Sequence, residues 1–383
     1  MTAIDTALET ALRDGAAAGI VAMAADRNGL IHQGAYGERM IGSGIPMTLD
    51  TTFRIHSMTK AVTAVACMQL VEQGRLDLDA ALGALLPDLA APSVLEGFDD
   101  SGAPILRPAR TPITLRRLLT HTAGFSYDIW NANTGRYQKA TGFPGPFSGT
   151  LTSLNQPLAF DPGARWHYSI AIDWAGKVVE AASGLDLESY FRRHIFGPLG
   201  MDDTTFVQSE PQRARRVTMH KRQPDGSIAP FILDRPETSE YFGGGGGLFG
   251  TAPDYMRFTR ALLSGGGPIL KPETVALMAR NHLGALRVEP MLSVMPGVSA
   301  DCDFWPGMEK TWGLSFLINT EDTPEGRSAG SLAWAGLSNL YFWIDPTRGV
   351  TGVYMSQILP FFDAKSVSAF KGFECAVYET IGK

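Results

Sequence analysis

Strand patterns lie at both ends of this 383-residue chain, and helical patterns fill the stretch between them. Near the start, two apolar runs flank Asn28-Gly29, a dipeptide that favours a tight hairpin turn. Near the end, further runs follow one another at the spacing of an antiparallel meander. We therefore expect the two ends to complete one antiparallel sheet around an inserted helical region. The expected strands are residues 19–25, 30–37, 312–318, 331–336, 340–344 and 350–355.

The middle of the chain sets the expected domain organisation. We predict an α+β fold in which residues 1–75 together with 310–383 form the sheet domain and residues 76–309 form a mainly helical inserted domain. Residues 125–167 are expected to be loops. After the pentaglycine run, Thr251 and Asp254 predict a helix start of the capping-box type. Helices are expected at 3–17, from about 57, and at 114–120, 171–184, 187–196 and 363–381.

The most apolar helical stretch begins near Ser57, and residues 61–71 are almost all apolar or small. Such a helix is expected to be buried on most of its surface. Lys60 follows Ser57 by one helical turn, so the two side chains share a face. Burial and the positive end of the helix dipole both lower the pKa of such a lysine, which could then act as the base for a serine nucleophile. The same spacing recurs at Ser368 and Lys371, to which no function is assigned.

Composition and charge narrow the class of protein. The net charge of −6 and the pI near 5.7 argue against binding a nucleic-acid backbone, which requires a basic face. Cys67, Cys302 and Cys375 form no C-x-x-C pair, so neither a disulfide framework nor a zinc site is expected. There is no apolar run of about 18 residues and no export signal. We expect a cytoplasmic protein without metal or organic cofactor; the oligomeric state is left open.

Two common hydrolase signatures, G-x-S-x-G and H-E-x-x-H, are absent from the sequence. A different candidate is Tyr168, which follows the turn at 161–163 and immediately precedes a helix. From there a phenol can project into a cleft, and a lysine ammonium held beside it would lower its pKa and make it a proton shuttle. On composition alone, packing at the helix start is the simpler interpretation.

Several motifs, taken together, resemble the serine β-lactamase and penicillin-binding protein superfamily, specifically its class C-like branch. Within that branch the chain most resembles the family VIII carboxylesterases, with statin-synthase-type acyltransferases as close relatives. The resemblance spans nearly the whole chain in the right order and implies a β-lactamase/transpeptidase-like fold with the active site between its two domains. The motifs are Ser57-Met-Thr-Lys60, 118–124 (Leu-Leu-Thr-His-Thr-Ala-Gly), Tyr168-Ser169, 243–258 and Trp312-Gly313-Leu314.

The resemblance implies a role for each matched residue. Ser57 would be the acylated nucleophile, and Lys60 would deprotonate it or depress its proton affinity. Tyr168 would protonate the leaving alkoxide and then activate the deacylating water. How the base role divides between Lys60 and Tyr168 stays open. The backbone N–H groups of Ser57 and Leu337 would form the oxyanion hole.

Two departures from the family pattern favour esters over lactams. The third motif is Trp334-Ala335-Gly336, where β-lactamases of this branch begin with a basic residue that holds the lactam carboxylate. Ile170 stands where they carry an asparagine that binds an amide. Each loss weakens recognition of an anionic amide by about 1–3 kcal/mol.

We therefore predict a serine carboxylesterase that hydrolyses short- to medium-chain esters. Three alternatives remain: a β-lactamase or D-Ala-D-Ala peptidase, an acyltransferase that passes the acyl group to an alcohol, and a non-catalytic binding protein. The last is disfavoured because Ser57, Lys60 and Tyr168 are all intact. The expected partner is a small-molecule ester, with no nucleic acid and no membrane.

Aromatic residues are dense where the rim of a cleft is expected. They fit either a hydrophobic substrate pocket or ordinary core packing, and the sequence favours neither. His56 and His121, which lie inside matched motifs, are expected to make structural hydrogen bonds. The candidate substrate-binding residues are Trp334, Gly336, Phe125, Tyr127, Trp130, Tyr241 and Phe304, with Phe242 and Trp305 nearby in sequence.

Overall fold

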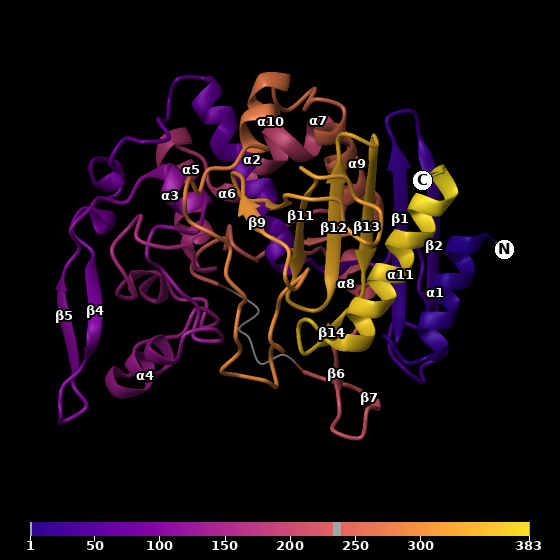
Figure 1. The fold of residues 1–383 in the computed structure, drawn as a ribbon, viewed down its shortest axis with the longest axis horizontal. Coiled ribbons are helices and arrows are strands. Elements are labelled where there is room, and N and C mark those ends of the chain that lie inside the picture. Colours follow the sequence, from indigo (N-terminus) through magenta and orange to yellow (C-terminus); the bar gives the residue numbers. More distant parts are fainter. Residues whose placement is uncertain (1, 233–238, 383) are drawn as a thin grey trace.

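A seven-stranded antiparallel sheet, in the order β2-β1-β13-β12-β11-β10-β9, forms one half of the protein (Figure 1). The computed structural model describes residues 2–232 and 239–382. β13, from the C-terminal end, pairs with β1 of the N-terminal hairpin, with Val21 opposite Met355. The prediction that both ends of the chain complete one sheet is therefore confirmed. The strands are β1 (Gly19–Asp26), β2 (Leu30–Gly37), β9 (Lys310–Trp312), β10 (Leu317–Asn319), β11 (Leu332–Gly336), β12 (Leu340–Asp345) and β13 (Val350–Met355).

One expected strand, residues 312–318, is two strands in the structure. β9 ends at Trp312 and β10 begins at Leu317, and a turn joins them in which Ser315 has a φ of 72°. The cause lies at Gly313, where an added Cβ would collide with the carbonyl oxygen of Met278. A backbone that approaches another segment this closely leaves its strand, and only glycine fits there.

Helices cover both faces of the sheet. Side chains alternate along a strand, so Tyr341 and Phe342 of β12 point to opposite faces. Tyr341 stacks on Phe370 of α11 (Ala364–Ile381) with ring centroids 4.4 Å apart, and Phe342 packs on Tyr255 of α9 (Ala252–Leu263) at 5.2 Å. Because both faces are covered, every residue of β11, β12 and β13 is buried.

The predicted start of α9 is only half right. The Thr251 hydroxyl accepts a hydrogen bond from the backbone N–H of Asp254, as expected of a helix cap. The Asp254 carboxylate does not return the bond; it accepts from the N–H of Asp203 and the hydroxyl of Thr204, both at 2.9 Å. α9 lies within the 76–309 segment yet packs on β1, β12 and β13. The division into two domains stays a prediction.

The helical half is centred on α2 (Thr59–Glu72), the apolar helix that the sequence predicts, and α5 (Ala171–Ser183) packs against it. α4 (Ala132–Thr141) lies in the stretch predicted to be loop, which makes that prediction wrong there. Only Thr134 of α4 is buried, so the helix carries no apolar periodicity by which to recognise it. The other helices are α1 (Ala3–Arg13), α3 (Leu115–Leu119), α6 (Leu187–Phe191), α7 (Gly197–Leu199), α8 (Glu210–Ala214) and α10 (Pro272–Met278).

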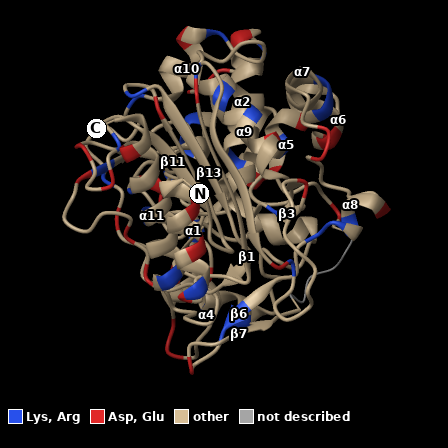
Figure 2. Ribbon diagram, turned by 90° about the vertical axis from the view of Figure 1, so that its right-hand side faces the viewer, with Lys and Arg blue, Asp and Glu red and all other residues tan. Residues whose placement is uncertain are grey.

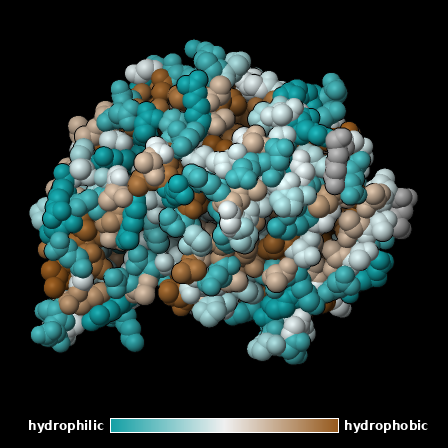
Figure 3. Space-filling model, in the orientation of Figure 1, coloured by the Kyte–Doolittle hydropathy of each residue, from teal (hydrophilic) through white to brown (hydrophobic). Residues whose placement is uncertain are grey.

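Short strands tie the loops together. β4 (Ser93–Phe98) and β5 (Pro104–Pro108) form a hairpin at the end of the molecule away from the sheet, with Ile105 and Leu106 nearly half exposed (Figures 1 and 3). Strands this short or irregular give too little periodicity to be predicted. The rest are β3 (Phe53–Arg54), β6 (His220–Arg222), β7 (Ile228–Pro230), β8 (Phe249–Gly250) and β14 (Ile358–Leu359).

The surface bears charges of both signs. In the view of Figure 2, Lys and Arg lie interspersed with Asp and Glu over the helices and loops. Within residues 2–232 and 239–382, every helix is too short or too polar to cross a membrane. In the part of the chain that the structure describes, Cys67, Cys302 and Cys375 form no disulfide.

Candidate active site

Ser57 lies in a single 3₁₀ turn, His56–Met58, which leads directly into α2. His56 holds the turn with a φ of 47°, a left-handed conformation that is uncommon outside glycine. Ser57 is partly exposed, whereas Lys60, in the first turn of α2, is completely buried. The Lys60 Nζ lies 3.2 Å from the Ser57 Oγ. The predicted pairing of these two side chains on one helix face is therefore confirmed.

Neutral oxygens surround the Lys60 amine. It donates to the Gly245 carbonyl oxygen at 2.6 Å and lies 3.2 Å from the Tyr127 hydroxyl, in addition to Ser57. Burial lowers the pKa of Lys60 to about 7, partly offset by the charge of Asp173. The predicted lowering of this pKa is confirmed. Near neutral pH a large fraction of the amine is unprotonated and can accept the serine proton.

Tyr168 completes the cluster of polar groups around Ser57. Its ring centroid lies 4.9 Å from the Lys60 Nζ, and its hydroxyl is hydrogen-bonded to Ser57. Burial raises the pKa of Tyr168 far above its usual value. The expectation that the lysine lowers this pKa is wrong, because desolvation of the phenolate outweighs the hydrogen bonds it receives. Tyr168 is therefore a neutral phenol that can donate a proton.

The Trp334 indole takes part in the same cluster. Its Nε1 donates a hydrogen bond of 3.0 Å to the Tyr168 hydroxyl oxygen, and the two rings are 4.8 Å apart. Two residues further along β11, a Cβ on Gly336 would lie 2.5 Å from the Ile55 carbonyl oxygen. The end of β11 therefore passes directly beside the turn that carries Ser57. Leu337, the expected second oxyanion donor, follows this glycine and is partly buried.

The structure brings together some of the predicted aromatic residues and separates others. The rings of Trp130 and Tyr127 lie 5.5 and 5.6 Å from Tyr168, and Phe304 lies 5.9 Å from Trp334. These rings surround the polar groups next to Ser57. The remaining candidates pack elsewhere: Phe125 against Trp174, Phe242 against Phe206, Trp305 beside Arg327, and Tyr241 against the hydrophobic core.

Two further residues, His121 and Ile170, provide packing near Tyr168 and no reactive group. His121 packs on Tyr168 at 4.7 Å, and its Nδ1 lies 3.2 Å from the Ser169 hydroxyl, as expected of a structural histidine. Burial holds the pKa of His121 well below its usual value, so the ring is neutral. Ile170, in place of the family's asparagine, is fully buried at the start of α5 and offers no polar group.

Sequence reasoning missed Gly245 and Asp173. The Gly245 carbonyl holds the Lys60 amine, and the Gly245 N–H donates to the Asp173 carboxylate at 2.8 Å. A Cβ at Gly245 would lie 2.8 Å from the Asp173 Cγ, so the glycine run packs tightly beside the site. The run itself was a usable signal. Its partner Asp173, on α5, gave no such signal in the sequence.

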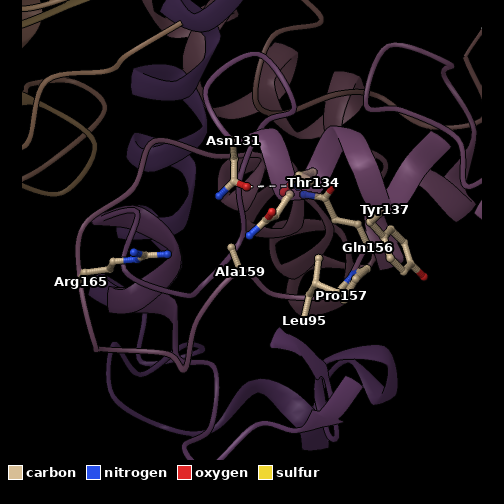
Figure 4. A pocket seen from close by; sticks show the side chains of 9 residues that line it. Leu95, Asn131, Thr134, Tyr137, Gln156, Pro157, Ala159 and Arg165 are labelled. Atoms are coloured by element: carbon tan, nitrogen blue, oxygen red, sulfur yellow. Dashed lines mark hydrogen bonds between the residues drawn. The ribbon is translucent and has the colours of Figure 1, made fainter. Parts of the chain in front are cut away.

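Two cavities lie near these elements. One is lined by Trp334, Phe304, Cys302 and Met291. The other lies between the start of α4 and residues 156–165 and is lined by polar side chains that include Asn131, Thr134, Gln156 and Arg165 (Figure 4). Among the described residues, the lining of this second pocket does not include Ser57 or Lys60.

The Beta-lactamase family profile matches residues 4–370. The chain belongs to the beta-lactamase family. Unliganded simvastatin synthase from Aspergillus terreus superposes with a TM-score of 0.86 at 34% identity, covering 98% of this chain and 97% of that chain. This similarity confirms the predicted β-lactamase-like fold of mixed helices and antiparallel sheet.

Two curated members of the family are similar over almost their whole length. Monacolin J acid methylbutanoyltransferase from Aspergillus terreus is 36% identical and covers 98% of this chain and 95% of its own. Lovastatin esterase from Penicillium rubens is 34% identical and covers 93% of both chains. The chain is therefore an enzyme of the hydrolase and acyltransferase group with the beta-lactamase fold. These relatives favour the acyltransferase alternative over the plain carboxylesterase that the sequence analysis placed first.

Proposed function

We propose that the protein is a serine acyltransferase, which takes an acyl group from an ester onto Ser57 and passes it to the hydroxyl of a small molecule. The observation that carries this proposal is the set of aromatic rings around a buried Lys60 and Tyr168, with Ser57 alone partly exposed. A cleft lined in this way favours an apolar alcohol over water as the acceptor. The relative named as a methylbutanoyltransferase supports the same reaction.

In the acylation step, the unprotonated Lys60 amine removes the Ser57 proton as the Oγ attacks the donor carbonyl carbon. The N–H groups of Ser57 and Leu337 stabilise the resulting oxyanion. The bond to the leaving group then breaks, and Tyr168 donates its proton to that group. The Lys60 ammonium reprotonates Tyr168, so one proton has moved from the serine to the leaving group.

In the transfer step, these movements run in reverse. The acceptor hydroxyl occupies the place that the leaving group has vacated, and the Tyr168–Lys60 pair takes its proton as its oxygen attacks the acyl carbon. The bond to the Ser57 Oγ breaks, and the serine recovers a proton. Water in the same place gives hydrolysis, so esterase activity is the side reaction of this mechanism.

The surroundings of Tyr168 set the expected substrate class. Trp334 and Ile170 provide no cation and no amide at this position. We infer that the acyl donor is uncharged near the reacting carbonyl, which disfavours lactams that carry a carboxylate. A small-molecule substrate, no nucleic-acid partner and a cytoplasmic site of action complete the proposal. The net charge of −6 supports the second, and three cysteines that form no disulfide among the described residues support the third.

Partitioning of the acyl-enzyme tests this proposal. The protein would be given a p-nitrophenyl ester with and without an apolar primary alcohol, and the new ester and free acid would be quantified by chromatography. We expect an initial burst of p-nitrophenol, faster turnover with alcohol, and ester as the main product at millimolar alcohol. Free acid alone, at an unchanged rate, would contradict acyl transfer and leave a carboxylesterase of the family VIII type.

Two serine variants provide the control for this experiment. Ser57→Ala removes the proposed nucleophile and is expected to abolish both products. Ser368→Ala changes an exposed serine in the second Ser-x-x-Lys spacing and is expected to leave both rates as in the wild type. Substantial activity in Ser57→Ala would refute the mechanism itself.

A further inference from the structure

The Asp173 carboxylate is linked to the Lys60 amine through the backbone N–H and C=O of one residue, Gly245. Asp173 occupies the first turn of α5 and is 8% exposed. Its Oδ1 accepts a hydrogen bond of 2.8 Å from the Gly245 N–H. The carbonyl oxygen of the same residue accepts a hydrogen bond of 2.6 Å from the Lys60 Nζ. Asp173 and Lys60 are thus joined through the backbone of Gly245.

The glycine loop is fixed between two helices. The Gly244 carbonyl accepts a hydrogen bond of 2.7 Å from the Thr63 hydroxyl, one turn after Lys60 on α2. A Cβ at Gly244 would lie 2.9 Å from the Ile172 carbonyl oxygen on α5. The loop therefore rests on α2 through two carbonyls and on α5 through Asp173, with no space for side chains. In this arrangement, moving the Asp173 carboxylate displaces the Gly245 carbonyl.

Asp173 also supplies a negative charge near the lysine. Of the titratable groups that face Lys60, Tyr127 and Tyr168 contribute hydroxyls, and His121 is neutral. The charge of Asp173 raises the pKa of Lys60 against the larger effect of burial. A carboxylate in the first turn of α5 is itself favoured by the positive end of the helix dipole.

We propose that Asp173 is a positioning residue for the reaction. It fixes the Gly245 carbonyl that aims the Lys60 amine at Ser57, and its charge favours the ammonium that forms when the amine takes the serine proton. This inference rests on the proposed acyl-enzyme chemistry. Asp173 touches neither Ser57 nor any reacting atom in this scheme, so its effect passes through Gly245 and Lys60.

The pH profile of acylation separates this role from a purely structural one. Asp173→Asn keeps an oxygen that can accept from Gly245 but removes the charge. We expect the rising limb of kcat/KM against pH to move to lower pH, because the amine loses its proton more readily, and the maximal kcat to fall about tenfold because the amine is a weaker base. KM should change little. Rates are taken per active site, counted from the p-nitrophenol burst.

A charge-conserving variant and a matched control complete the experiment. Asp173→Glu keeps the charge but displaces the carboxylate by one methylene, so kcat should fall while the limb stays near its wild-type position. Glu180→Gln removes a carboxylate from the same helix, where it is paired with Lys177. This variant should change neither kcat nor the position of the rising limb.

Each outcome has a distinct meaning. If Asp173→Asn keeps both the wild-type kcat and the wild-type position of the rising limb of kcat/KM against pH, the inference is overturned. If that variant does not fold, a wild-type kcat in Asp173→Glu would overturn it instead. A wild-type enzyme that gives only free acid in the presence of the alcohol would refute the proposed function itself, which is a separate result.

Discussion

Among residues 2–232 and 239–382, the cations Lys60 and Arg327 are completely buried, and their surroundings differ. Arg327 packs beside the rings of Trp305 and Trp343, and both of its hydrogen bonds to the Glu374 carboxylate measure 2.5 Å. Lys60 has three neutral oxygen partners and, among residues 2–232 and 239–382, forms no ion pair. Asp173 raises the pKa of Lys60 through its charge and is linked to the amine through the backbone of Gly245.

This difference separates a structural charge from a reactive one. A bidentate carboxylate compensates the desolvation of Arg327 and joins α11 to the segment before β11. Lys60 has no such compensation, so burial disfavours its ammonium and brings its pKa to about 7. An amine held in this way destabilises the fold but can exchange a proton at neutral pH, as is common at functional sites.

The largest effect is expected from removing the reactive cation. Lys60→Met should slow acylation by about 10²–10⁴-fold, because the general base is lost. The fold should become about 1–3 kcal/mol more stable at pH 7, because relief of the desolvation penalty outweighs hydrogen bonds of about 1 kcal/mol each. Burst kinetics and urea unfolding measure the two effects. A variant that is both inactive and markedly less stable would mean that Lys60 is a structural residue like Arg327.

Removing the carboxylate of the Arg327–Glu374 ion pair should lower stability and leave activity unchanged. Glu374→Gln leaves the Arg327 guanidinium buried without a countercharge, and we expect a loss of about 3–5 kcal/mol in the free energy of unfolding. The acylation rate per folded molecule should be unchanged, since α11 covers the sheet and does not contact Ser57. Glu309→Gln is the matched control, because its ion pair with Arg287 is exposed and should be worth less than about 1 kcal/mol. A similar loss in both variants would contradict the comparison.

Local periodicity explains what the sequence could predict. The N-terminal hairpin, the C-terminal strands and the Ser57–Lys60 face of α2 all depend on residues a few positions apart. Lys60 was predicted to have a low pKa because one helix provides both its burial and its dipole.

Long-range contacts explain what the sequence could not predict. The sign of the Tyr168 pKa shift depends on burial by rings distant in sequence, those of Tyr127, Trp130 and Trp334, and local sequence suggested only the lysine. The break between β9 and β10 depends on the Met278 carbonyl oxygen. The Asp173–Gly245–Lys60 connection joins residues 72 and 185 positions apart. None of these contacts leaves a periodic signal.

Raising the pH should reduce the amount by which buried Lys60 destabilises the folded protein. The pKa of Lys60 is about 7 in the folded protein, against 10.5 for the free side chain. Between these values the unfolded chain binds more protons, so the contribution of Lys60 to stability rises with pH, by at most about 1.4 kcal/mol per unit. The stability advantage of Lys60→Met over the wild type should therefore shrink from pH 7 to pH 9. Urea unfolding of both proteins across this range measures it, and a constant difference would show that Lys60 has an ordinary pKa.

The smallest effect is expected from Tyr127, whose hydroxyl is one of the three oxygens around the amine. Tyr127→Phe keeps the ring against Tyr168 and removes one partner of the ammonium, so kcat/KM should fall about 3- to 10-fold, as for one hydrogen bond of about 0.5–1.5 kcal/mol. The rising limb of the pH profile should move to lower pH, in the same direction as for Asp173→Asn.

Tyr137→Phe, on α4, is the matched control and should leave the rate and the limb unchanged. A fall in rate without movement of the limb would place Tyr127 among the residues that contact substrate, as the sequence analysis predicts. A fall in rate together with movement of the rising limb would place Tyr127 with Gly245 as a hydrogen-bond partner of Lys60. The neutral oxygens around Lys60 would then set the working pH of the enzyme, a property that the ion-paired Arg327 cannot provide.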